Sequence, residues 1–158
     1  MTEPAGHALE PRPAAESDFE TVFAITMATM RAYVEATWGI WDEAEHRSRI
    51  RDSFEPSTHR LVHVDGQLAG LLAAKEHAEH VQLVKVFLLP PFQGRGSGTR
   101  LVRQVMAQAA AQERPVRLRV LRVNPARRLY LRLGFVITDE TPERLIMEWR
   151  PGGEPRAD

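Results

Sequence analysis

The chain has 158 residues, no cysteine, and 21 basic Lys and Arg side chains against 21 acidic Asp and Glu side chains. This length suits one domain whose apolar core needs no metal or disulfide. The lack of cysteine excludes disulfides, thiolate metal sites, iron–sulfur clusters and cysteine nucleophiles, and favours a reducing compartment. The balanced charge gives no overall field that would attract nucleic acid or an anionic membrane.

The N-terminal segment carries acids and prolines where a signal peptide would carry basic residues and then an apolar core. No apolar run approaches the roughly 18 residues of a membrane-spanning helix. We therefore expect a soluble, cytoplasmic protein with no membrane partner. Residues 1–8 and 151–158 are polar or rich in Pro and Gly, which predicts a frayed N-terminus and a disordered tail around one domain over residues 9–150.

The first elements are a short strand over residues 9–13 and a helix that starts at Ser17, where Glu20 three residues later completes a capping box. A second, more polar helix is expected over residues 43–54. Between the two helices, residues 33–43 are both aromatic and acidic.

Two apolar runs, residues 59–64 and 68–74, flank Asp65-Gly66, a pair typical of a two-residue β-hairpin turn. A polar turn over residues 75–80 leads into a strand over residues 81–89. The early part of the chain thus predicts consecutive antiparallel strands.

Three glycines, Gly94, Gly96 and Gly98, follow this strand within the stretch LLPPFQGRGSGT. Apolar residues at helical spacing from Leu101 onward predict a helix that ends near Pro115. The glycines therefore lie at a helix N-terminus, where free N–H groups and the positive end of the helix dipole bind phosphate. A glycine-rich turn used only for tight packing is the alternative.

Two familiar phosphate-binding motifs do not fit. A dinucleotide fingerprint requires a third glycine where Thr99 stands, and a P-loop requires a lysine after the glycines. Downstream, the spacing predicts a strand over residues 116–123, a helix over 125–133, and strands over 136–138 and 145–149. Strands grouped before a single crossover favour an α+β fold with a mixed sheet.

Two motifs in this order resemble the GNAT superfamily of acyl-CoA-dependent N-acyltransferases. They are Gln93-x-x-Gly96-x-Gly98 after the fourth strand, and Asn124 followed by Tyr130-x-x-x-Gly134-Phe135 after the fifth. The likeness in element order runs from residue 9 to residue 149. It implies a mostly antiparallel central sheet that is splayed between its fourth and fifth strands and flanked by about four helices.

The resemblance implies acetyl-CoA as co-substrate and no metal. It places the CoA pyrophosphate on main-chain amides of the glycine loop, an oxyanion-stabilising amide at Leu88, and a general acid at Tyr130, for which a core aromatic is the alternative. The implied cofactor-binding residues are Val86, Phe87, Leu88, Gln93, Gly94, Arg95, Gly96, Ser97, Gly98, Thr99, Asn124, Arg127 and Tyr130. Ser97 departs from the apolar residue usual in the family and is expected to cap the helix with its hydroxyl.

In this family the first interhelical region typically lines the acceptor site, which here implies Tyr33, Glu35, Trp38 and Trp41. Aromatic faces and carboxylates suit a cationic amine. Equally, the two tryptophans could anchor a loop on the core. Whether the acceptor is a small-molecule or a protein amine stays open.

The strand over residues 81–89 has no carboxylate to serve as general base, so the base lies elsewhere or is a water relay. The candidates are Glu76, Glu79 and Glu35, and for each the alternative is a plain surface acid. His77 and His80 lack the helical spacing of a zinc motif, so no metal is expected.

The sequence therefore predicts an acetyl-CoA-dependent N-acetyltransferase that works by direct attack in a ternary complex. One alternative is a CoA-binding regulatory or interaction module with little catalysis. A second is an acetyltransferase acting on RNA-linked or protein amines, which would use the arginines of residues 114–132, although aromatic stacking partners are sparse there. A homodimer is left open.

Overall fold

The computed structural model describes residues 8–152, so the ends expected to be frayed or disordered lie almost wholly outside the described residues. A single seven-stranded sheet in the order β1-β2-β3-β4-β5-β7-β6 forms the centre. Neighbouring strands are antiparallel except β4 and β5, which are parallel. The strands are β1 (Leu9–Pro13), β2 (His59–Val64), β3 (Gln67–Glu76), β4 (Val81–Leu88), β5 (Val116–Leu121), β6 (Val136–Glu140) and β7 (Arg144–Trp149).

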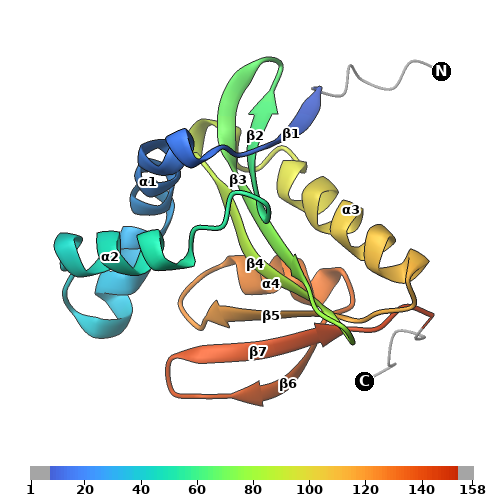
Figure 1. The fold of residues 1–158 in the computed structure, drawn as a ribbon. Coiled ribbons are helices and arrows are strands. Elements are labelled where there is room, and N and C mark those ends of the chain that lie inside the picture. The colour runs from blue at the N-terminus through green and yellow to red at the C-terminus, as the bar shows by residue number, and fades with distance from the viewer. Residues whose placement is uncertain (1–7, 153–158) are drawn as a thin grey trace.

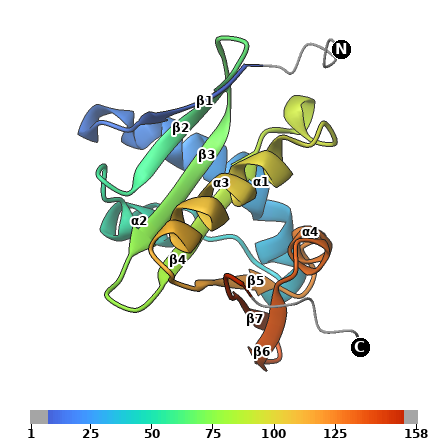
Figure 2. The same cartoon turned by 90° about the vertical axis from the view of Figure 1, so that its right-hand side faces the viewer.

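Over residues 8–152, four α-helices flank the sheet, so the expected α+β class and sheet type are confirmed. The helices are α1 (Phe19–Trp38), α2 (Glu43–Ser53), α3 (Ser97–Ala111) and α4 (Ala126–Arg132). Figure 1 shows α1 and α2 on one side of β1–β4 and α3 on the other, while β5, β7 and β6 turn away below. In Figure 2, α3 crosses in front of the strands and α1 lies behind them.

Apolar side chains pack on both faces of the sheet. One cluster joins α3 to β4, β5 and β7 and includes the fully buried Leu101, Leu118 and Phe135. The other joins α1 and α2 to β2 and β3 and includes Val22 and Leu71. Each face of the sheet is thus covered by its own helices.

The sheet parts between β4 and β5, as the family resemblance implied. These strands share only the pairs Val81↔Val116 and Gln82↔Arg117, although β4 continues to Leu88. β4 also carries a β-bulge near the point where it parts from β5. Ala73 pairs with Lys85 and Ala74 pairs with Leu83, so Val84 is an extra residue on β4. A bulge bends its strand and increases the local twist. The bulge also reverses which β4 residues face each side.

The start of the first helix differs from the sequence prediction. Residues Glu16–Asp18 form a 3-10 turn and α1 begins at Phe19, so the expected start at Ser17 with a capping box to Glu20 is wrong. Instead, the Asp18 carboxylate accepts a hydrogen bond from the N–H of Ala15 at 2.7 Å. This contact fixes the turn that precedes α1.

The end of α1 also differs, because Tyr33, Glu35 and Trp38 lie on its last turns rather than between two helices. The helix continues until Gly39, whose φ of 82° supplies the left-handed residue of a C-cap. The hairpin prediction is confirmed, since Asp65 and Gly66 have φ of 51° and 80° between β2 and β3. Positive φ at both central residues is the type I′ pattern.

Gly70 on β3 allows β4 to approach closely, because a Cβ at this position would overlap the carbonyl oxygen of Phe87. We expect Gly70→Ala to lower the free energy of unfolding by about 1–3 kcal/mol, the usual cost of overpacking. Gly98→Ala is the matched control, since its Cβ would lie 3.5 Å from Leu129 Cδ2, an ordinary contact. Urea denaturation of the three proteins measures both effects, and an unchanged midpoint for Gly70→Ala would contradict the close approach.

Candidate active site

Two cavities open where β4 and β5 part. The loop cavity, of about 490 Å³, lies against the glycine loop and the start of α3 and is lined by Gln93, Gly94, Gly96, Gly98 and Thr99 among others. The basic cavity, of about 470 Å³, lies between α1, α2 and the strands and is lined by Lys85, Arg119 and Arg144 among others. The two cavities share the lining residues Met30, Val86, Phe87, Asn124 and Tyr130. The two cavities therefore adjoin at these five residues.

The glycine loop has the backbone that its composition predicts. Gly94 and Gly96 have φ of 75° and 80°, a region that L side chains rarely adopt. Gly96 is the N-cap of α3, and no side chain caps this helix, so the cap expected from the Ser97 hydroxyl does not form. Ser97 is buried instead. The first N–H groups of α3 remain available to an anion, as at any helix N-terminus.

Tyr130 lies at the junction of the two cavities. Its ring is 7 % exposed and meets the ring of Phe135 edge-on, with the centroids 5.7 Å apart. Burial raises the pKa of Tyr130 to about 12, so its hydroxyl stays protonated throughout the physiological range. The short helix α4 holds the ring in place. The side chain of Asn124 accepts a hydrogen bond from the N–H of Ala126 at 2.9 Å as α4 begins.

Most of the residues expected to bind the cofactor lie around the loop cavity. The loop cavity is lined by the expected residues Val86, Phe87, Leu88, Gln93, Gly94, Gly96, Gly98, Thr99, Asn124 and Tyr130. The side chains of Arg95, Ser97 and Arg127 line neither cavity. Gln93 also braces the loop, because its amide donates a hydrogen bond to the carbonyl oxygen of Leu88 at 2.8 Å.

The residues expected at the acceptor site are dispersed. Trp38 lines the basic cavity, whereas Tyr33 lines the loop cavity. Glu35 lines neither cavity and pairs with Arg31 at 2.7 Å. Trp41 also lines neither cavity, and its ring stacks on His46 with the centroids 3.9 Å apart.

The acids expected as general base lie away from the junction. Glu76 ends β3 opposite Val81, at the end where β4 and β5 are still paired, and accepts a hydrogen bond from Gln112 at 3.2 Å. Neither Glu76 nor Glu79 lines either cavity. Within residues 8–152 no group of three or more His, Asp or Glu side chains could hold a metal ion.

Lys85 is a residue that the sequence analysis passed over. The bulge at Val84 turns Lys85 toward α2, where its Nζ donates to Nε2 of His59 at 3.3 Å. The Nδ1–H of His59 in turn donates to the carbonyl oxygen of Glu55 at 2.9 Å, which leaves Nε2 as the acceptor. Burial lowers the pKa of Lys85 to about 8. The pKa of His59 is lowered mainly by burial and, to a smaller extent, by the charge of Lys85.

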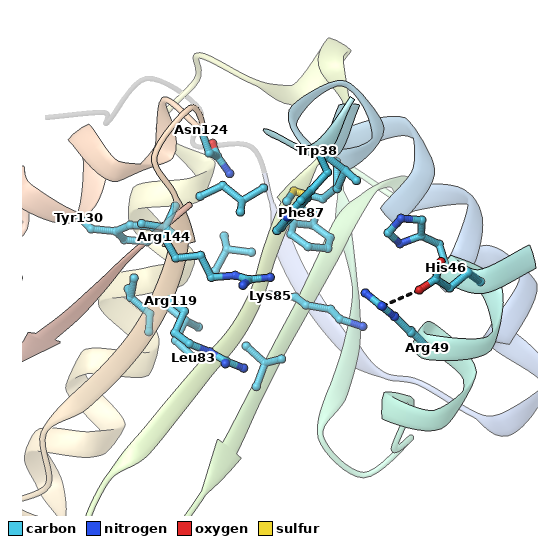
Figure 3. A pocket seen from close by; sticks show the side chains of 18 of the residues that line it. Trp38, His46, Arg49, Leu83, Lys85, Phe87, Arg119, Asn124, Tyr130 and Arg144 are labelled. Atoms are coloured by element: carbon cyan, nitrogen blue, oxygen red, sulfur yellow. Dashed lines mark hydrogen bonds and ion pairs between the residues drawn. The ribbon is translucent and has the colours of Figure 1, made fainter. Parts of the chain in front are cut away.

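The remaining charges of the basic cavity are Arg119 on β5, Arg144 on β7, and Asp42, Glu45 and Arg49 around α2. Figure 3 shows Lys85 on one side of the cavity and Arg119 and Arg144 on the other, with Tyr130 and Asn124 beyond. The alternation of Arg117 and Arg119 along β5 could have indicated one arginine-bearing face, but not what lies opposite.

A family model described as the acetyltransferase (GNAT) family matches residues 21–135. No curated protein matches the chain in sequence. Many solved structures match in fold, and all those named here share less than 25% identity with the chain. Over the described residues no helix has the length and apolar character needed to cross a membrane.

The PaiA N-acetyltransferase of Thermoplasma acidophilum, solved with coenzyme A, has a TM-score of 0.70 at 21% identity, with 90% of this chain and 99% of that chain covered. The ribosomal-protein-S18-alanine N-acetyltransferase of Escherichia coli has a TM-score of 0.67 at 16% identity, with 95% and 98% covered. Naa50 of Arabidopsis thaliana, solved with the bisubstrate analogue CoA-Ac-MVNAL, has a TM-score of 0.62 at 15% identity, with 89% and 97% covered.

Proposed function

The chain belongs to the acetyltransferase (GNAT) family, and we propose that it transfers an acetyl group from acetyl-CoA to a primary amine by direct attack in a ternary complex. The observation that carries this proposal is the junction of the two cavities at Val86, Phe87, Asn124 and Tyr130. A donor in the loop cavity and an acceptor in the basic cavity would meet at that junction, which favours direct transfer over a covalent enzyme intermediate.

Acetyl-CoA would occupy the loop cavity. The N–H groups of residues 94–98 suit its pyrophosphate, so Arg95 and Ser97 would contribute through their main chain although their side chains line neither cavity. The pantetheine arm would follow β4 along Val86–Leu88, where β5 has turned away and leaves backbone groups beside the gap. The related protein of Thermoplasma acidophilum was solved with coenzyme A, which supports this choice of donor.

In the proposed reaction the nitrogen of the amine forms a bond to the thioester carbonyl carbon, and the carbon–sulfur bond then breaks. The N–H of Leu88 would stabilise the oxyanion, and the hydroxyl of Tyr130 would give its proton to the departing thiolate. The high pKa of Tyr130 keeps that proton in place until the thiolate forms. Burial in the same junction would raise the proton affinity of the thiolate too.

The amine must lose a proton, and Lys85 is better placed to accept it than Glu76, Glu79 or Glu35. Lys85 lines the basic cavity and holds a pKa of about 8, whereas none of the three carboxylates lines that cavity. Neutral Lys85 can donate one N–H to His59 and still accept a proton from the amine. We therefore assign the role of general base to Lys85.

The arginines of residues 114–132 give little support to an RNA-directed function, because several of them are paired with carboxylates or line the basic cavity. Arg117 pairs with Glu148 at 2.8 Å, Arg122 pairs with Glu140 at 3.4 Å, and Arg119 lines the basic cavity. A protein amine remains compatible with the site, since the related Escherichia coli protein is named for a ribosomal-protein substrate.

Acetyl-CoA binding can be tested at Gly98, which lines the loop cavity without a positive φ. We expect Gly98→Glu to weaken acetyl-CoA binding in calorimetry by at least tenfold, because it adds a carboxylate and bulk beside the pyrophosphate. Gly98→Ala is the matched control and should bind within a few-fold of wild type. Equal affinities for all three proteins would contradict the assignment of this cavity to the donor.

Tyr130→Phe removes the proposed acid and keeps the ring that packs on Phe135. We expect kcat for acetyl transfer to fall by about 10²–10⁴, the usual contribution of a positioned proton donor. The dissociation constant for acetyl-CoA, measured by calorimetry, should stay within a few-fold. Unchanged turnover would remove the role of Tyr130, and a wild-type protein that binds acetyl-CoA but acetylates no amine would be a binding module.

The pH dependence tests Lys85. Only neutral Lys85 accepts a proton, so kcat/KM should be low at pH 6.5 and rise through an apparent pKa of about 8. In Lys85→Met the rise of kcat/KM near pH 8 should disappear. The slower reaction that remains should accelerate only as the acceptor ammonium itself loses its proton, near pH 10. Lys75→Met, at the one other lysine of the chain, is the matched control and should keep the rise near pH 8. An unaltered pH profile in Lys85→Met would exclude this residue as the base.

A further inference from the structure

One face of β5 and β7 carries three arginines that differ in the residue opposite them. Arg117 stands opposite Glu148 and forms an ion pair of 2.8 Å with it, and Glu148 also pairs with Arg150 at 2.7 Å. Two residues further along β5, Arg119 stands opposite Ile146. On β7, Arg144 stands opposite Leu121. The sheet therefore supplies a carboxylate to the arginine outside the cavity and apolar partners to the two inside it.

Arg119 and Arg144 are diagonal neighbours on this face. Diagonal positions of an antiparallel pair lie about 7–8 Å apart, within reach of long side chains. Both side chains line the basic cavity, and Figure 3 shows both extending toward its centre. Both residues are exposed, so solvent weakens the repulsion between the two guanidinium groups, and both groups are accessible to an anion that enters the cavity.

The acids near the cavity are already committed elsewhere. The Asp42 carboxylate accepts a hydrogen bond from the N–H of Glu45 at 3.1 Å and so caps α2. The Glu45 carboxylate pairs with Arg49 at 2.5 Å. Among the described residues that line the basic cavity there is no third carboxylate. The cavity thus has a net positive charge at the wall formed by β5 and β7.

Trp38 holds one of the two arginines in position. The guanidinium of Arg144 lies over the indole ring of Trp38, 5.1 Å from its centroid. A stacked guanidinium keeps its N–H edges free, and those edges match the two oxygens of a carboxylate or a phosphate. This contact would give Trp38, which itself lines the basic cavity, a positioning role there.

We propose that the acceptor is a small amine that carries an oxyanion group, a carboxylate or a phosphate, which Arg119 and Arg144 bind while the amine points toward Tyr130. The proposal rests on the acetyl transfer proposed above and specifies its acceptor class. A cavity of about 470 Å³ has the size of a small-molecule site. The oxyanion of the acceptor would balance the positive charges of Arg119 and Arg144, for which the cavity provides no carboxylate.

The test compares amines that differ only in the oxyanion group, each with saturating acetyl-CoA: phenylalanine with phenethylamine, histidine with histamine, and phosphoethanolamine with ethanolamine. Release of the CoA thiol gives kcat and KM. In at least one pair we expect the oxyanion-bearing member to have the lower KM by tenfold or more. The first two pairs report on a carboxylate and the third on a phosphate.

Arg119→Gln and Arg144→Gln should raise KM for the preferred acceptor by tenfold or more and leave KM for its neutral partner within twofold. Arg60→Gln is the matched control, since Arg60 is an exposed arginine on β2 that lines neither cavity. Arg119→Lys should restore part of the loss because it keeps the charge. An equal KM within every pair, or an unchanged KM in both glutamine variants, would overturn the proposal.

A binding measurement separates this proposal from the proposed function. Calorimetry on the CoA-loaded protein compares the products N-acetylphenylalanine, N-acetylphenethylamine and N-acetylphosphoethanolamine. Tighter binding of a charged product than of the neutral one, lost in Arg119→Gln, supports the oxyanion site even if no amine is acetylated, and in that case acetyl transfer is the part that fails. Equal binding of all three products overturns the oxyanion site.

Discussion

The short overlap of β4 and β5 is the constraint on which the site depends. Two parallel strands that run side by side would satisfy each other's backbone groups along their full length, but here the pairing stops after Gln82 and Arg117. Beyond that point β4 still has a full antiparallel partner in β3, so its other edge is open without the strand being lost. An open edge inside a sheet is a place where a ligand can add the missing hydrogen bonds. We propose that the pantetheine arm of acetyl-CoA does so.

An open sheet of this kind needs support from both faces. The cluster beneath α3 ties β4 to β5 and β7 through Leu101, Leu118 and Met147, so the strands stay in one sheet although they diverge. The cluster under α1 and α2 packs on β2 and β3 and leaves the region between α2 and β5 unfilled. That unfilled region is the basic cavity. The same division of the core therefore holds the sheet together and creates the cavity in which we propose that the acceptor binds.

Much of the fold was accessible from the sequence because its signals are local. Asp65-Gly66 specifies its turn by positive φ, and the glycines after β4 specify a loop conformation that other residues rarely adopt. The end of α1 could have been placed correctly, since Gly39 is the first residue after the helix that readily takes the left-handed conformation. Pairing across the sheet was not accessible, because it joins residues far apart in the chain. Nothing near Arg119 in sequence shows that Ile146 lies opposite it, while Glu148 lies opposite Arg117.

The bulge at Val84 illustrates how one non-local feature decides the chemistry of the site. In an unbroken strand, Lys85 would share the face of Val81 and Leu83, which pack in the apolar cluster beneath α3. A lysine there would be an unpaired buried charge, at a cost of several kcal/mol. The extra residue turns Lys85 to the opposite face instead, where His59 accepts from its Nζ and the basic cavity begins. There the remaining burial lowers its pKa to about 8, and the energetic cost of holding this cation is what makes it a usable base near neutral pH.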